Sequence, residues 1–196
     1  NGECVPCDGL CPKTCKGVSQ INNDNVDQFK DCTVIEGSTT ILDSTFTGYH
    51  DMDETFSFSR QIPPMAPEKL EVFSTLKEIT GYMNIQGDHK NFTSLSFLRY
   101  VSTLRDIRFR GTFYQNVPSI DLHRNLEIIG GRELTQSYFA SLYIVKTSLH
   151  FLGLTSLKKI HSGGVAILEN EHLCYTEGLN WTKIKKSLEH HTPASE

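Results

Sequence analysis

A four-residue phrase with leucine first and isoleucine last recurs along the chain and sets its hydrophobic pattern. It occurs at 76–79 (LKEI), 104–107 (LRDI), 126–129 (LEII) and 157–160 (LKKI), so the leading leucines are 28, 22 and 31 residues apart. Such irregular repetition is typical of stacked coils, because each coil returns its Leu and Ile to one buried column while the loops vary in length. The pattern predicts six inward-pointing side chains: Leu76, Ile79, Leu126, Ile129, Leu157 and Ile160.

Short segments rich in Ile, Val and Tyr follow three of the four phrases. They lie at 81–87 (GYMNIQG), 138–145 (YFASLYIV) and 163–170 (GGVAILEN), and an earlier segment at 33–42 (TVIEGSTTIL) has the same character. Alternation and β-branched content of this kind indicate strands. Repeated strands joined by variable loops predict a mainly β fold, a right-handed parallel β-helix (solenoid) similar to leucine-rich repeats.

Three segments predict short capping helices. The segment at 25–32 begins at an Asn or Asp cap, and the one at 67–76 opens with proline and glutamate, which suit a first helical turn. The segment at 180–191 repeats apolar residues at helical spacing.

Four of the six cysteines fall within residues 4–15 (CVPCDGLCPKTC). A structural zinc site normally separates its two ligand pairs by about 12 to 20 residues, whereas only three residues separate Cys7 from Cys11. The tripeptides at Asn91 and Asn180 are N-glycosylation acceptors, which matter only in a secreted chain. We therefore interpret the cysteines as disulfide-bonded, in an extracellular chain without a metal site.

The composition fits a folded domain. With 38% hydrophobic residues and a formal charge of −4, the chain is neither disordered nor a basic nucleic-acid-binding protein. Cysteine density falls after Gly17, so we place a boundary between the end of a cysteine-rich region (1–17) and a single domain (18–196). No apolar run approaches the roughly 20 residues of a membrane span. Without an initiating Met or a signal peptide, we expect a piece of a larger protein.

Catalysis is not expected. Parallel β-solenoids also host polysaccharide lyases and hydrolases, which need paired carboxylates, or a carboxylate with a base, on one sheet face. The predicted strands hold no acid at YMNIQ, ASLYIV and VAIL, the eight histidines are scattered, and His190 and His191 fit a helix end. We expect neither catalytic residues nor a cofactor.

Five motifs occur in an order that closely resembles the EGF receptor (ErbB) family of receptor tyrosine kinases: CVPCDGLCPKTC, PEKLEVFSTLKEITGYMNIQG, LEIIGGREL, TSLKKI and NEHLCYTEGLNWTKI. They resemble the end of the family's first cysteine-rich region followed by domain III, the second L domain. The resemblance covers nearly the whole chain, and several details look more like an invertebrate than a vertebrate member.

The resemblance implies a disulfide framework and two cysteines without partners in this chain. By similarity to the family, the pairs are Cys7 with Cys11 and Cys15 with Cys32. The family partners of Cys4 and Cys174 lie outside the chain.

The resemblance also implies that the large sheet face binds one side of an EGF-like growth factor, while a separate domain I binds the other. The positions that match family contacts are Thr40, Ser44, Gln86, Phe139 or Ala140, and Ala166. In the loop at 49–60, Asp51 and Asp53 are candidates for pairing with a ligand arginine, with Phe56 or Phe58 as the neighbouring aromatic.

The predicted function is therefore that of the ligand-binding extracellular domain of an EGF-receptor-like kinase, a single-pass receptor at the cell surface. Its partners would be an EGF-like growth factor, the other domains of the same receptor and a second receptor copy in a signalling dimer. The alternative is a secreted L-domain decoy or structural module without a kinase of its own.

Residues 98–124 have almost no counterpart in the family. Either they add a rung that buries Leu104 and Ile107, or they leave the rod as a basic loop. An extra rung would lengthen the rod by about 4.8 Å and separate Gln86 from Ala166 on the proposed ligand face. We therefore favour the loop.

Overall fold

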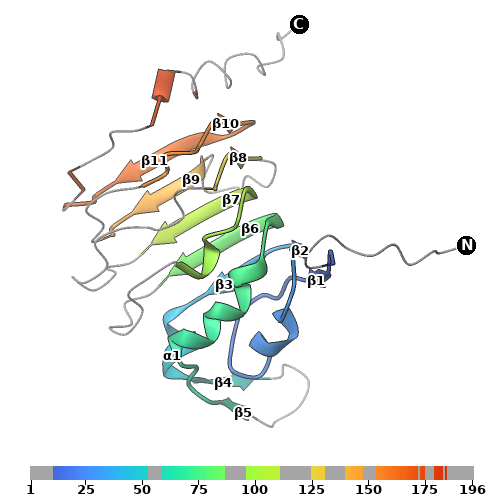
Figure 1. Ribbon diagram of the computed structural model, residues 1–196. Helices are drawn as coiled ribbons and strands as arrows, with labels where there is room; N and C mark the ends of the chain where they lie inside the picture. The colour runs from blue at the N-terminus through green and yellow to red at the C-terminus, as the bar shows by residue number, and fades with distance from the viewer. Residues whose placement is uncertain are drawn as a thin grey trace, which may run out of the picture.

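The protein is mainly β in the part of the chain that can be described (Figure 1). The computed structural model describes residues 11–52, 59–86, 96–110, 125–130, 140–147, 153–171, 173–174, 179–182 and 184. Its strands are β1 (Thr14–Lys16), β2 (Val34–Glu36), β3 (Thr39–Ile41), β4 (Tyr49–Met52), β5 (Ser59–Ile62), β6 (Glu78–Gln86), β7 (Thr103–Arg110), β8 (Ile128–Ile129), β9 (Ala140–Val145), β10 (Lys159–Ile160) and β11 (Gly164–Leu168). Its longer helical segments are η1 (Val26–Phe29), α1 (Asp43–Thr47), η2 (Pro67–Thr75) and η3 (Ser96–Leu98).

Nine of these strands form one sheet in which neighbouring strands run parallel. The first half of β6 lies between β2 and β7, and this half of the sheet continues through β8 to β10. The second half of β6 lies between β3 and β7, and that half continues through β9 to β11. Figure 1 shows the strands stacked one above another in chain order, with the antiparallel hairpin β4–β5 at the N-terminal end beside α1. The strands expected at 33–42, 81–87, 138–145 and 163–170 are all present.

The predicted inward column is confirmed. Ile79, Leu104, Ile129 and Ile160 are register partners in successive strands. The exposed fractions of the six predicted side chains are 0% for Leu76, Leu126, Ile129 and Ile160, 1% for Ile79 and 6% for Leu157.

A stack of aromatic rings joins three of the helical segments along one side of the core. The ring centroids of Phe29 in η1 and Phe73 in η2 are 5.1 Å apart, and Phe73 lies 6.1 Å from Phe97 in η3. The helices expected at 25–32 and 67–76 therefore form, but as tighter 3-10 helices, whose i to i+3 bonds include Leu76 N–H to Phe73 C=O at 2.9 Å. Of the helix expected at 180–191, residues 181–182 and 184 are helical and the others lie outside the described residues.

The expectation that residues 98–124 form a loop is wrong for their first half. Strand β7 occupies 103–110 and lies between β6 and β9 (Figure 1). Leu104 and Ile107 are both fully buried. Residues 111–124, where the loop was expected to close, lie outside the described residues.

Backbone hydrogen bonds join strand β7 to the strands on both sides. The Lys77 carbonyl accepts the N–H groups of Ser102 and Thr103, at 2.9 and 3.3 Å. The Ser102 carbonyl in turn accepts those of Glu127 and Ile128, at 3.0 and 3.3 Å. A loop that left the sheet could not make both sets of bonds. The segment is therefore an integral strand, with β6 on one side and β8 and β9 on the other.

The register also corrects the position of the repeated phrase. Leu104 pairs with Ile79 and Ile129, so it occupies the isoleucine position of the phrase and not the leucine position. The buried Val101 takes the leucine position. With Val101 in the leucine position, the first residues of three successive phrases, Leu76, Val101 and Leu126, are evenly spaced at 25 residues.

A glycine permits close contact between successive turns of the chain. The Gly81 N–H donates to the Gly37 carbonyl at 2.9 Å. A Cβ at Gly81 would overlap the Gly37 carbonyl and the Ser38 hydroxyl, so a side chain is excluded there. Gly37 itself has a φ of 94°, a conformation that favours glycine.

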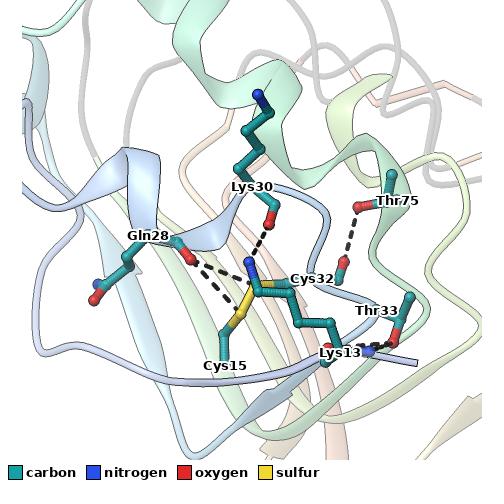
Figure 2. Close-up of a disulfide and its surroundings, with 7 residues drawn as sticks. All are labelled: Lys13, Cys15, Gln28, Lys30, Cys32, Thr33 and Thr75. Atoms are coloured by element: carbon teal, nitrogen blue, oxygen red, sulfur yellow. Dashed lines mark hydrogen bonds between the residues drawn. A yellow bond between two sulfur atoms is a disulfide. The ribbon is translucent and has the colours of Figure 1, made fainter. Parts of the chain in front are cut away.

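The N-terminal strand is tied down by a disulfide between Cys15 and Cys32, whose Cα atoms are 6.0 Å apart (Figure 2). The Gln28 carbonyl oxygen lies 3.7 and 3.6 Å from the two sulfurs, which carry no proton in a disulfide. On the other side, the Cys32 carbonyl accepts the Thr75 hydroxyl at 2.8 Å. The bond therefore holds β1, which precedes the domain boundary expected at residue 17, against β2 and η2.

Candidate functional site

Strands β3, β6, β7, β9 and β11 form one half of the sheet, and one face of this half points away from the core. Met83 and Ile85 of β6 and Leu142 and Ile144 of β9 point into the core and are at most 1% exposed. Since residues alternate between the two faces of a strand, the positions between and beside them form the opposite face. We call this surface the outer face.

One row of the outer face runs across all five strands. Its register partners, one from each strand in the order of the sheet, are Thr40, Asn84, Arg108, Tyr143 and Ala166. Asn84, Tyr143 and Ala166 are half-buried. A row of this kind offers contacts to a partner surface.

A second row contains Gln86, Arg110, Val145 and Leu168. Leu168 is 55% exposed, one of two large apolar side chains so exposed among the described residues. Together with Tyr143 and Ala166, it forms an apolar strip over β9 and β11. An exposed strip of this kind is a reasonable contact surface for a protein partner.

The structure brings Gln86 and Ala166 onto the same outer face, but at a distance. Gln86 lies on β6, and its amide nitrogen donates to the Asn84 side chain at 3.0 Å. Strands β7 and β9 intervene before Ala166 on β11, which places the two residues about 14 Å apart across the sheet. Strand β7 accounts for about 4.8 Å of that separation.

The N-terminal segment covers the other predicted contacts at the β3 edge. Thr40 is only 7% exposed, and its carbonyl accepts the Ile21 N–H at 2.8 Å. Ser44, in α1, is half-buried, and its hydroxyl accepts the Gln20 side-chain amide at 2.8 Å. Both residues are thus less accessible than contact positions on a bare sheet edge.

Asp51 is exposed on the hairpin β4–β5, opposite Arg60. The Arg60 guanidinium binds the Asp24 carboxylate at 2.7 Å, and among the described residues no bond to the Asp51 side chain is found. Asp53, Phe56, Phe58 and Phe139 lie outside the described residues, and Ala140 is known only as the first residue of β9.

Comparison with known proteins shows which proteins this chain resembles. The family model described as "Receptor L domain" matches residues 31–118 and 107–185. The chain is 57% identical to an epidermal growth factor receptor of Apis mellifera and 43% identical to one of Drosophila melanogaster, each over 94% of the chain. It is 35% identical to an epidermal growth factor receptor of Gallus gallus over 93% of the chain.

The chain belongs to the receptor L domain family, within the EGF receptor group. It spans only 12%, 11% and 22% of the lengths of these three relatives. The two insect receptors are more similar to it than the avian one, which supports an invertebrate-like receptor L domain. The two family matches overlap at 107–118, so the first contains the whole of β7 and the second begins within it.

The remaining cysteines and sequons of the L domain are only partly described. Cys11 is disulfide-bonded, while Cys4 and Cys7 lie outside the described residues. Cys174 is an exposed free thiol. Asn180 is exposed, and Asn91 lies outside the described residues.

A shallow groove of about 380 Å³ runs over the other half of the sheet, across β6, β7, β8 and β10. Its polar lining includes Glu78, Thr80, Thr103 and His161, and Gly130 also lines it. The groove therefore brings one carboxylate, Glu78, and one imidazole, His161, to this half of the sheet. Within the described ranges, no group of three or more metal-ligating side chains occurs, and no helix is long and apolar enough to cross a membrane.

Sequence reasoning missed Asn84, Tyr143 and Leu168, which belong to the outer face of the L domain. The signal that could have found them is the period-2 alternation around Met83 and Leu142. Both residues are buried, so their neighbours in the strand lie on the opposite face. Only the pairing of β6 through β7 to β9 then shows that these residues share one row or neighbouring rows.

Proposed function

We propose that the chain is the ligand-binding domain III of an EGF-receptor-like receptor tyrosine kinase, and that its outer face contacts one side of an EGF-like growth factor. The observation that carries this proposal is the apolar strip of Tyr143, Ala166 and Leu168 on an outer face shared with Gln86. The names of the insect relatives support it, because each is an epidermal growth factor receptor.

The proposed architecture is a right-handed parallel β-helix of the L-domain type, residues 18–196, preceded by the end of a cysteine-rich region, residues 1–17. Parallel pairing through nine strands and one continuous inward column support it. The chain itself would carry no catalytic residues. The parent would be a single-pass transmembrane kinase that presents this domain outside the cell and dimerises when ligand binds.

The proposed contact set keeps all the positions that resemble family contacts. They are Thr40, Ser44, Asp51, Asp53, Phe56, Gln86, Phe139, Ala140 and Ala166. Asp51 is the one charged member of this set that lies within the described residues, and it is exposed; we propose that it pairs with a ligand arginine.

The proposed covalent features follow the same family pattern. Cys7 would pair with Cys11, and Cys4 and Cys174 would each bond a cysteine outside this chain. Asn91 and Asn180 would carry N-linked glycans, and the exposure of Asn180 supports this for the second sequon.

Calorimetric titration with a purified EGF-like growth-factor domain tests the function. Because half of the family's ligand site lies on another domain, we expect a Kd on the order of micromolar for this chain. Asp51→Lys should weaken binding by about tenfold, the effect of losing one charge-assisted contact. Glu68→Lys, at an exposed residue of η2, is the matched control and should leave binding unchanged. Absence of binding by the parent chain would support a purely structural module.

A further inference from the structure

The hairpin β4–β5 places the Asp51 carboxylate opposite an arginine. Asp51 and Arg60 are register partners in the antiparallel pair, so their side chains lie on the same face of the hairpin, with Cβ atoms about 5 Å apart. The next pair on that face is Tyr49 with Ile62, and Ile62 is only 4% exposed. This face is therefore turned toward the protein at Ile62 and reaches solvent at Asp51 and Arg60, which are both exposed.

Opposite charges at such positions attract each other across the two strands. The Arg60 guanidinium nevertheless binds a different carboxylate, that of Asp24, with Nη2 2.7 Å from Oδ2. Asp24 lies between β1 and η1, 36 positions earlier in the chain. The tertiary structure thus supplies a competing acceptor for an arginine that local pairing alone would direct to Asp51.

Asp24 is held in position by a turn rich in asparagine. The Asn22 side-chain oxygen accepts the backbone N–H groups of Asp24 and Asn25, at 3.0 and 3.1 Å. The Asn25 side-chain oxygen accepts the Asn22 N–H at 2.9 Å, and the Asn25 amide donates to the Gln20 carbonyl at 2.8 Å. Because these bonds fix the backbone on both sides of Asp24, its carboxylate is presented to the hairpin at a defined place.

The same turn binds the hairpin at a second point. The Asn22 side-chain amide donates to the Tyr49 hydroxyl at 3.0 Å. Tyr49 lies two residues before Asp51 and therefore on the same face of β4. Two bonds from one turn thus fix the hairpin face relative to Asp24, so the ion pair with Arg60 is supported by its surroundings.

We propose that Asp24 is a positioning residue for ligand binding, which holds the Arg60 guanidinium and so keeps the Asp51 carboxylate accessible to a ligand arginine. This rests on the proposed function, in which Asp51 makes that contact. Without the Asp24 charge, Arg60 would turn to its cross-strand partner Asp51, occupy that carboxylate and repel an approaching guanidinium. The side chains of Arg60 and Asp24 are 73% and 30% exposed, so solvent screens the exchange of partners and its effect on ligand affinity is moderate.

A mutant cycle in the ligand titration tests this role. The probe is the purified EGF-like growth-factor domain of the binding experiment above, titrated by calorimetry into each folded chain. The chains are the parent, Asp24→Asn, Asp24→Asn with Arg60→Gln, Asp51→Asn, and Asp51→Asn with Asp24→Asn. Glu127→Gln is the matched control, because Glu127 is the acid of another exposed ion pair, with Lys158 at 2.6 Å, beside strand β8. Circular dichroism and thermal melts check that every chain is folded.

We expect Asp24→Asn to bind the probe about two- to fivefold more weakly than the parent, the range of an exposed ion pair. Adding Arg60→Gln should restore the parent affinity, because the competing guanidinium is then gone. Asp51→Asn should itself bind about tenfold more weakly, and adding Asp24→Asn to it should cause no further loss. Glu127→Gln should bind as the parent does.

Rescue by Arg60→Gln separates this positioning role from a merely structural one. If Asp24→Asn and its double variant with Arg60→Gln are equally weak, Asp24 acts independently of the arginine and the proposal is wrong. If Asp24→Asn binds as the parent does while Asp51→Asn is weakened, the positioning role is wrong and the proposed function stands.

Two other results would remove the basis of the proposal. If Asp51→Asn binds as the parent does, Asp51 is not a ligand contact and the role of Asp24 falls with it. If the probe does not bind the parent at concentrations up to about 1 mM, the proposed function is itself wrong. Since the bond to Asn22 uses only the Asp24 backbone, Asp24→Ser keeps the turn and decides the question should the asparagine variant unfold.

Discussion

Replacing Leu104 by alanine tests whether the added strand is part of the hydrophobic core. Leu104 is 0% exposed and lies in register between Ile79 and Ile129. A buried leucine-to-alanine change costs about 2 to 5 kcal/mol, with the largest losses where the surroundings cannot collapse into the cavity. Since backbone hydrogen bonds hold the strands on both sides, we expect a loss of about 3 to 5 kcal/mol in the free energy of unfolding.

Thermal and urea denaturation of the oxidised chain, followed by circular dichroism, measure this loss. For a domain of this size, 3 kcal/mol lowers the Tm by about 6 to 12 °C. Leu76→Ala and Leu157→Ala, in the predicted column, should each cost about 2 to 5 kcal/mol. Tyr100→Ala is the control from the same inserted segment, since its side chain is 55% exposed, and it should cost less than about 1 kcal/mol.

The reasoning fails if Leu104→Ala is no more destabilising than Tyr100→Ala while Leu76→Ala shows its expected loss. That outcome would mean that β7 packs outside the core and that the segment is a loop after all. Equal losses at Leu76 and Leu104 would establish one continuous core through the insertion.

Three further changes probe other parts of the structure by the same denaturation assays. The Thr39 hydroxyl is buried with no hydrogen-bond partner in the described structure, so Thr39→Val should raise stability by about 1 kcal/mol; a lower Tm would contradict this. Asn170 accepts two hydrogen bonds from Thr147 and donates one to each of two strand carbonyls, so Asn170→Ala should cost about 2 kcal/mol, and an unchanged Tm would refute that role. Replacing Cys15 and Cys32 together by alanine opens a loop of 17 residues and should cost about 3 kcal/mol; equal stability with and without reductant would argue against the bond.

Local residue patterns were sufficient to predict strands β2, β3, β6, β9 and β11 and the inward column. The strand segment at 81–87 alternates apolar and polar residues, and a half-buried strand must show that period whatever its partners are. The leucine phrases at 76, 126 and 157 likewise predict burial. Each phrase places two large aliphatic side chains at the same spacing, and stacked repeats bury such equivalent positions in one column. The family could also be recognised from the sequence, because its motifs are long and occur in order.

The accessibility of the predicted contacts could not be read from the sequence. Thr40 lies in a strand whose edge is covered by the segment containing Ile21, and Ser44 accepts a hydrogen bond from Gln20. These contacts join residues about 20 positions apart, so no local pattern reports them.

The role of the insertion was decided by the tertiary structure alone. The sequence offers two overlapping frames, Leu104 with Ile107 and Val101 with Leu104, and all three residues are apolar, so hydrophobic pattern cannot choose between them. The choice comes from backbone hydrogen bonds between strands 25 residues apart, which set Leu104 opposite Ile79 and Ile129. The sequence determined which side chains are apolar and are therefore buried in the core. Only pairing with the strands on either side determined that residues 103–110 form a strand of the sheet.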